Sequence, residues 1–258
     1  MSDAIKLSPS EVVLLHGDSF FTGGELREIG SEKKYFVTRD GEKGIARNGY
    51  TKVLGSDVLV PIRGFAKSVL AVVFLACEQS QLLRMDVRKD EWGTGQDTVV
   101  LTELRLNSNP YPPSAIESRI QGLLNQPPHV VKVHQLPELI HGLFSKKAPY
   151  FWGVSDPFLS ILEIAKEGLA ERNLLSVYEY AGTNFLTMLI SKIKNPVDVW
   201  TTNARISNLR IVAASGVNSV KDLILDCQTQ RPQFWTQFTK DISTGISSRK
   251  LPRSMTAP

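Results

Sequence analysis

The sequence predicts a mainly α-helical fold with small β hairpins: a compact helical domain with winged-helix-like helix–strand units. Three observations lead to this prediction. Apolar residues recur at steps of three and four over several stretches, as in amphipathic helices. Short apolar stretches bounded by glycine, asparagine or proline are typical of strands and turns. A unit of helix, polar turn, Leu-Leu and strand occurs twice, over 65–87 and 157–180.

The first helix is predicted at the N-terminus. The stretch "SPSE" at 8–11 reads as a capping box, with a serine N-cap, proline at the first helical position and glutamate three residues after the serine. The apolar residues 12–15 follow, and Gly17 is the first residue that can end the helix. Residues 23–61 are polar and rich in glycine, which predicts loops and a hairpin around Asp40-Gly41.

A buried helix is predicted over 65–80, where apolar residues recur at helical steps. Two strands follow, "LLRMDVRKD" and "TVVLTEL", with "WGTG" as the turn between them. Ser114 and Glu117 then predict a second capping box, in front of a helix whose apolar stripe includes Ile116 and Ile120.

The C-terminal half reads as further helices and one strand. One helix is predicted with Val133 on its apolar stripe and Pro137 in its first turn. Asp156 and Pro157 begin the next as N-cap and first residue, and Asn173 ends it before the strand "LLSVYEY". Three last helices are expected over 203–215, 218–227 and 232–242.

Bulk composition is that of a globular protein. The 258 residues are 42% hydrophobic and 22% charged, with a net charge of +4. We expect a single domain over 1–245 and a disordered basic tail over 246–258.

Cys77 and Cys227 are predicted as reduced core thiols. With no signal-peptide pattern and no apolar run long enough to span a bilayer, we expect a cytoplasmic protein that is free or peripheral on a membrane.

The stretch "GDSF" at 17–20 resembles the nucleophile block of GDSL (SGNH) hydrolases, with Ser19 as the nucleophile. Such an enzyme needs a late histidine, with an aspartate three residues before it, to take the proton of the serine. His141 is the last of the four histidines, and none has an aspartate at that spacing. The hydrolase is therefore the third hypothesis, and no catalytic residue is predicted. His134, Glu138 and His141 could share a helix face, but their spacing is unusual for a metal site, so no metal or cofactor is predicted.

Basic residues are the remaining candidates for a site. Arg63 precedes the buried helix, and Arg84, Arg88 and Lys89 lie in the strand that follows it. These four residues are predicted to contact the phosphate of a ligand, against the alternative that they form an ordinary solvated surface. The partner would be an anionic membrane surface or another phosphate-bearing ligand, with nucleic acid as the alternative and protein partners besides.

The order of elements resembles the Golgi phosphoprotein 3 family. The stretches that carry the resemblance are "IKLSPSEVVLLHGDSFFTG", "SVLAVVFLACEQSQLLRMD" and "GLAERNLLS". It implies a mostly helical domain at the membrane surface; eukaryotic members recognise phosphatidylinositol 4-phosphate and retain glycosyltransferases in the Golgi. Arg63 stands where the family has a lipid-binding arginine. The family's upstream tryptophan has no counterpart in "KVLGSDVLVP", and its later arginine pair falls near Leu159 and Leu162.

The sequence thus favours a non-enzymatic binding or adaptor protein, a lipid-phosphate binder at a membrane surface. The alternative is a winged-helix-like nucleic-acid-binding or nucleoprotein-like chain, whose basic hairpins contact phosphates.

Overall fold

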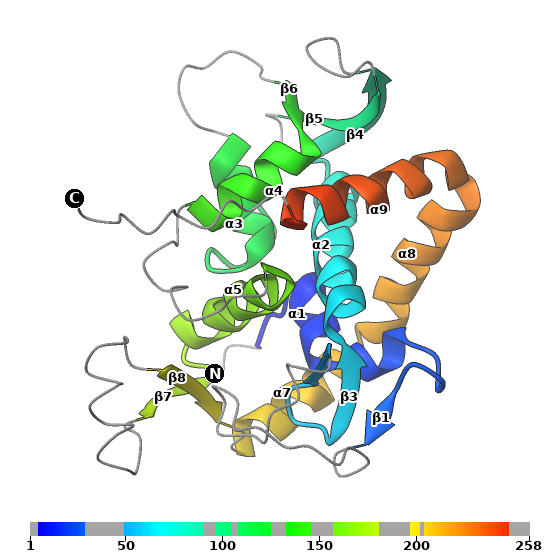
Figure 1. The fold of residues 1–258 in the computed structure, drawn as a ribbon. Helices are drawn as coiled ribbons and strands as arrows, with labels where there is room; N and C mark the ends of the chain where they lie inside the picture. The colour runs from blue at the N-terminus through cyan, green and yellow to red at the C-terminus, as the bar shows by residue number, and fades with distance from the viewer. Residues whose placement is uncertain are drawn as a thin grey trace, which may run out of the picture.

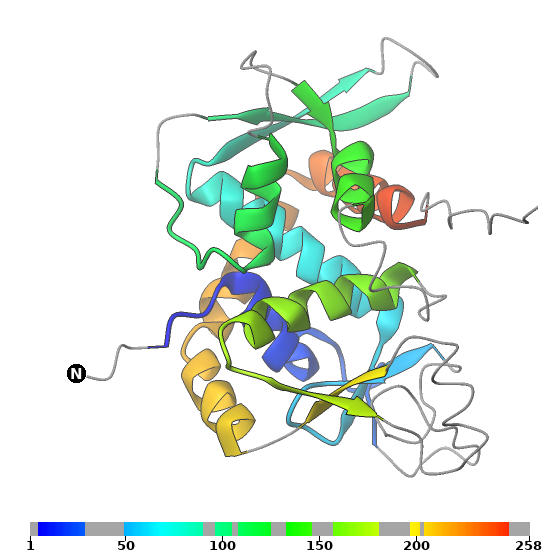
Figure 2. The ribbon, with the colours of Figure 1, turned by 90° about the vertical axis from the view of Figure 1, so that its left-hand side faces the viewer.

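The structure, a computed structural model, describes residues 5–28, 49–89, 96–104, 108–124, 133–145, 157–180, 197–201 and 204–247. In these ranges the protein is mainly helical, with eight α-helices and three small antiparallel sheets (Figures 1 and 2). The mainly helical class with small β hairpins is therefore confirmed.

The helices are α1 (Pro9–Leu15), α2 (Ile62–Gln79), α3 (Ile116–Leu124), α4 (Leu136–Ser145), α5 (Pro157–Glu171), α7 (Ala204–Ala214), α8 (Val217–Gln230) and α9 (Pro232–Ser247), with a short 3-10 helix η1 (Gly17–Phe20). The first sheet has the order β1 (Arg27–Glu28), β3 (Val58–Pro61), β2 (Tyr50–Lys52). The second has the order β4 (Leu83–Lys89), β5 (Asp97–Glu103), β6 (Val133–Gln135), and the third pairs β7 (Ser176–Tyr180) with β8 (Val197–Thr201).

Helix α2 is the centre of the hydrophobic core. Every residue from Val69 to Cys77 is buried, so the helix is covered on all sides. It packs against α1, α5, α8 and α9, and Figure 1 shows it running through the middle of the molecule with α5 on one side and α8 on the other. Any surface site on α2 must therefore use its two ends or a gap between its neighbours.

The predicted helix over 65–80 is confirmed, but it begins earlier. Strand β3 leads directly into α2, with Pro61 as the N-cap and Ile62 as the first helical residue. Arg63 consequently lies in the first turn of the helix and does not precede it.

The capping box of α1 is confirmed: the Glu11 carboxylate accepts a hydrogen bond from the Ser8 amide at 2.8 Å. The predicted hairpin around Asp40, the turn "WGTG" and the N-cap Asp156 lie outside the described residues.

Two local predictions are wrong. Ser114 and Glu117 do not form a capping box, because the Ser114 hydroxyl donates to the Gly168 carbonyl at 2.8 Å and Glu117 reaches α1 instead. Val133 is not helical, because β6 pairs with β5 and α4 begins only at Leu136.

The predicted domain boundary at 245 falls inside α9, which continues to Ser247 with Ile246 buried. The predicted tail beyond it lies outside the described residues.

The two predicted helix–turn–strand units end their helices in the same way. Gln81 after α2 and Asn173 after α5 have φ angles of 55° and 56°. The Leu82 amide then donates to the Cys77 carbonyl, and the Leu174 amide to the Leu169 carbonyl, both at 2.9 Å. These are Schellman motifs, and each leads into a β hairpin, β4–β5 or β7–β8. The finer comparison with winged-helix modules stays a prediction.

Candidate functional site

The segment "GDSFF" packs against the start of α2 through two glycines. A Cβ on Gly17 would lie 2.6 Å from the Phe65 ring, and a Cβ on Gly64 would lie 2.8 Å from the Phe21 ring. The two rings also meet edge to face, with centroids 6.4 Å apart. Each phenylalanine thus occupies the space left by the glycine of the other segment. We call this contact the glycine–phenylalanine interlock.

The polar residues around this segment contact Arg210 of α7. The Arg210 guanidinium donates to the carbonyls of Leu15 and Leu54, the latter at 3.0 Å, and lies 3.5 Å from the Asp18 carboxylate. The His16 ring nitrogen Nε2 lies 2.7 Å from the Arg210 carbonyl oxygen. Arg210 therefore joins α7 to α1, to η1 and to the turn between β2 and β3, and His16 adds a contact between α1 and α7.

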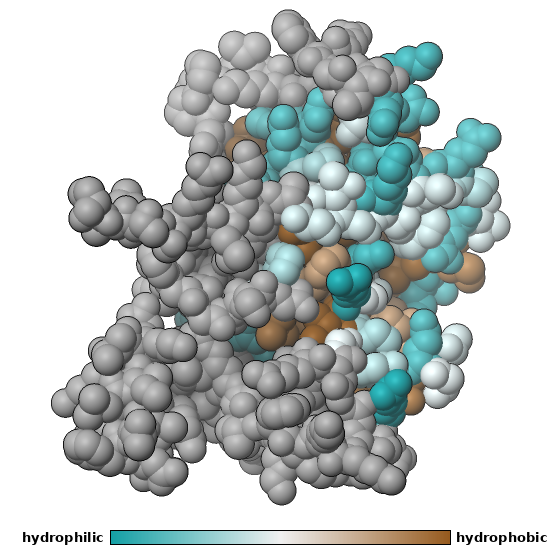
Figure 3. Space-filling view, viewed as in Figure 1, coloured by the Kyte–Doolittle hydropathy of each residue, from teal (hydrophilic) through white to brown (hydrophobic). Residues whose placement is uncertain are grey.

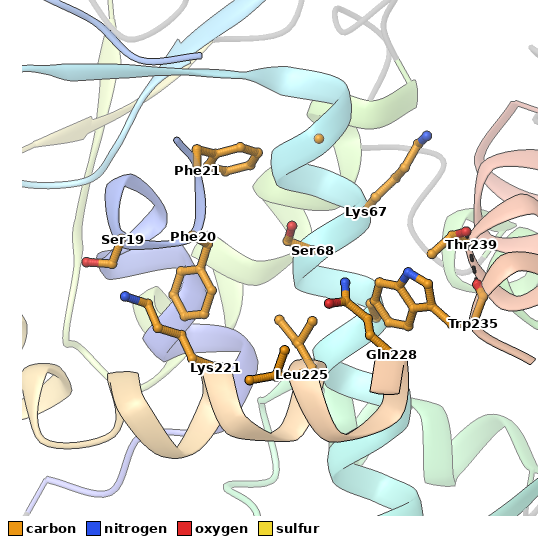
Figure 4. A pocket seen from close by; sticks show the side chains of 13 residues that line it. Ser19, Phe20, Phe21, Lys67, Ser68, Lys221, Leu225, Gln228, Trp235 and Thr239 are labelled. Carbon is orange, nitrogen blue, oxygen red and sulfur yellow. Dashed lines mark hydrogen bonds between the residues drawn. The ribbon is translucent and has the colours of Figure 1, made fainter. Parts of the chain in front are cut away.

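A concave site, here called the basin, lies beside this segment. Its volume is about 530 Å³. Four elements enclose it: η1, α2, α8 and α9, and Figure 3 shows hydrophobic surface in the recess between them. The lining residues (Figure 4) are Ser19, Phe20, Phe21, Gly64, Lys67, Ser68, Ala71, Lys221, Ile224, Leu225, Gln228, Trp235 and Thr239.

The basin combines an apolar lining with positive charge. Lys67 of α2 and Lys221 of α8 are its only charged lining residues in the part of the chain that the structure describes. The Lys221 ammonium lies 6.0 Å from the centroid of the Phe20 ring. Leu225 is 58% exposed, although large apolar side chains are usually covered. The site therefore offers apolar surface and two cations to a ligand, and none of its described lining residues carries a carboxylate that would repel an anion.

Of the four predicted site residues, Arg63 is the one that lies near the basin. It is exposed, and its guanidinium lies 5.6 Å from the centroid of the Phe158 ring of α5. Lys67 follows Arg63 by four residues, so the two side chains neighbour each other on one face of α2. This spacing is visible in the sequence and indicates a basic pair on one helix face, because a lysine one turn after the arginine interrupts an otherwise apolar helix.

The other three predicted residues lie on β4. Arg84, Arg88 and Lys89 are exposed, and the Arg84 guanidinium is 3.2 Å from the Asp86 carboxylate. Arg63 and β4 flank opposite ends of α2, whose 18 residues extend over roughly 27 Å. The structure therefore does not bring the four predicted residues together.

The groups with shifted pKa values lie elsewhere. Burial raises the pKa of the carboxyl groups of Glu11 and Glu117 and of the thiols of Cys77 and Cys227. Burial also raises the pKa of Tyr111 to about 12. None of these five residues lines the basin, and both cysteines are free and buried. Across the described ranges, no group of three His, Cys, Asp or Glu side chains is arranged to hold a metal ion.

No family model, curated protein or solved structure matches this chain. The resemblance to the Golgi phosphoprotein 3 family stays a prediction. Among the described residues, no helix is long and apolar enough to cross a membrane.

Proposed function

We propose that the protein is a non-enzymatic binding protein that holds a phosphate-bearing amphiphile in the basin. One observation supports this function above all: an apolar recess of about 530 Å³ carries two lysines and no carboxylate among its described lining residues. Its volume is in the usual range for small-molecule sites, roughly 300–1,000 Å³. An adaptor role at a membrane surface is consistent with a ligand of this kind.

The apolar part of the ligand supplies most of the affinity. Each CH₂ group that leaves water contributes about 0.8 kcal/mol, and the aromatic rings of Phe20 and Trp235 offer large apolar contact areas. A lysine at an exposed site adds up to about 1 kcal/mol, because water and salt screen its charge. The lysines therefore select an anionic head group over a neutral one, while the lining residues around Leu225 hold the chain.

The first test compares dodecyl phosphate with dodecylphosphocholine, below their micelle concentrations, by isothermal titration calorimetry. We expect dodecyl phosphate to bind about fivefold more tightly, since about 1 kcal/mol corresponds to that ratio. The double substitution of Lys67→Met with Lys221→Met should remove the preference, because these are the two described lysines of the basin. Lys240→Met is the matched control, because Lys240 is exposed on α9 and does not line the basin. No binding of either amphiphile, or equal affinity for both, would show that the proposal is wrong.

Two further measurements separate the other hypotheses. Flotation with vesicles that contain anionic lipid tests membrane association at low salt, and a gel shift over a salt series tests nucleic-acid binding, whose affinity should fall steeply with salt. An ester-hydrolysis assay with Ser19→Ala tests the hydrolase. Nucleic-acid binding that depends on Arg84 and Arg88 but not on Lys221 would favour the alternative function over the proposed one.

A further inference from the structure

We infer that the basin takes one ligand with two separate anionic groups, one at each end of an apolar body. This inference rests on the proposed function and specifies its ligand class. It follows from the placement of the two lysines, from the apolar side chains between the walls that carry them, and from the four elements that bound the basin.

The two positive charges lie on opposite walls. Lys67 extends from α2 and Lys221 from α8, and Figure 4 shows the two side chains on opposite sides of the basin, with Ser68 between them. Neither lysine forms an ion pair with a described residue. A single small head group placed beside one lysine would leave the other without an anion.

Polar side chains lie at both ends of the basin. Ser19 lies at the η1 end, on the same side as Lys221, with its hydroxyl directed away from the other lining side chains (Figure 4). At the α9 end lie the Gln228 amide and Thr239, whose hydroxyl donates to the Trp235 carbonyl at 3.0 Å. The apolar lining residues Ala71, Ile224 and Leu225 come from the walls formed by α2 and α8. A ligand that is polar at both ends and apolar in the middle matches this order of side chains.

The elements that bound the basin favour a compact ligand over a helical partner. Helix α9 contacts both α2 and α8 and bounds one end. At the other end Phe21 packs on Gly64 of α2, and Phe20 lies beneath the Lys221 ammonium of α8. A helix is about 10–12 Å wide with its side chains and needs a groove with open ends. A recess bounded on four sides suits a compact, separate molecule.

The test compares dodecyl phosphate with alkane-1,ω-bisphosphates of eight to sixteen carbons, again by calorimetry. We expect one bisphosphate length to bind about fivefold more tightly than dodecyl phosphate, with shorter and longer chains weaker. Lys67→Met and Lys221→Met should each reduce the affinity for that bisphosphate to the level of dodecyl phosphate. Lys240→Met should leave both affinities unchanged.

The outcomes distinguish this inference from the proposed function. If dodecyl phosphate binds and every bisphosphate binds equally well, the inference of two anionic groups is wrong and the proposed function stands. The inference is also wrong if Lys67→Met leaves the affinity for the best bisphosphate unchanged. If neither kind of ligand binds, the proposed function fails, and this inference fails with it.

Discussion

Replacing Glu117 with alanine should destabilise the protein by about 3 kcal/mol. The Glu117 side chain is fully buried, and its two oxygens accept hydrogen bonds from the Ser10 amide and the Ser10 hydroxyl, both at 2.9 Å. Ser10 lies in the first turn of α1, where backbone N–H groups have no partner within the helix. Alanine would leave the buried Ser10 amide without this acceptor and the Ser10 hydroxyl with only the Ser8 hydroxyl, 3.1 Å away, as a partner. Each buried donor that loses its acceptor costs about 1–3 kcal/mol, and the space left by the side chain adds to this.

Urea unfolding followed by circular dichroism measures this effect as a lower midpoint with an unchanged slope. The control is Glu138→Ala, because Glu138 also lies in the first turn of a helix but is exposed. We expect the control to stay within about 0.5 kcal/mol of the wild type. A free energy of unfolding for Glu117→Ala that equals that of Glu138→Ala would refute the assignment of Glu117 as the side-chain acceptor for the start of α1.

The same carboxyl group predicts a pH dependence. Burial raises the folded-state pKa of Glu117 above its usual value, and the Glu11 charge adds to the rise. Between about pH 4.3, the ordinary glutamate pKa, and the raised pKa, the unfolded chain binds fewer protons than the folded one, so stability falls as pH increases. Glu117→Gln should flatten this part of the stability curve. A curve identical to the wild-type curve would contradict the reasoning.

Three other substitutions test the contacts that shape the molecule. Gly64→Ala should cost about 1–3 kcal/mol in urea unfolding, because the new methyl group meets the Phe21 ring at 2.8 Å. Arg210→Ala should cost about 2–3 kcal/mol, since the carbonyls of Leu15 and Leu54 lose their donor, and Arg210→Lys should recover only part of the loss because lysine lacks the forked guanidinium. Asp241→Ala should lower the melting temperature, because the Asp241 carboxylate accepts the backbone amide of β5 at Val99 at 2.6 Å.

Most elements of the fold were predictable because their signals are local. Helices α2, α5, α8 and α9 carry apolar residues at helical steps, and the polar turns after α2 and α5 precede Leu-Leu pairs. The errors came where a distant partner decides the structure. Glu117 has the spacing of a capping box, but its carboxylate serves Ser10, 107 residues away. Val133 fits a helical stripe, but β5 offers it a strand partner.

The basin was not predictable by the same means. Its walls come from η1, α2, α8 and α9, so its residues extend from Ser19 to Thr239 in the sequence. Lys221 and Leu225 alone read as an ordinary exposed lysine and a leucine on an amphipathic helix. Only the packing of α8 against α2 and of α9 across both makes them neighbours of Lys67. The four basic residues predicted from the sequence do not form one site. Arg63 and Arg84 are close in sequence, but they lie at opposite ends of α2.

The stretch "GDSF" at 17–20 forms η1, which packs against α2 and lines the basin. The glycine–phenylalanine interlock fixes η1 to α2, and η1 forms one end of the basin. A ligand that binds only the folded basin stabilises the protein by mass action, so ligand binding and η1 docking are thermodynamically linked. Gly64→Ala should therefore weaken ligand binding as well as stability, whereas Glu117→Ala, which acts at the start of α1, should lower stability alone. Binding that stays unchanged in both variants would mean that the basin does not need η1.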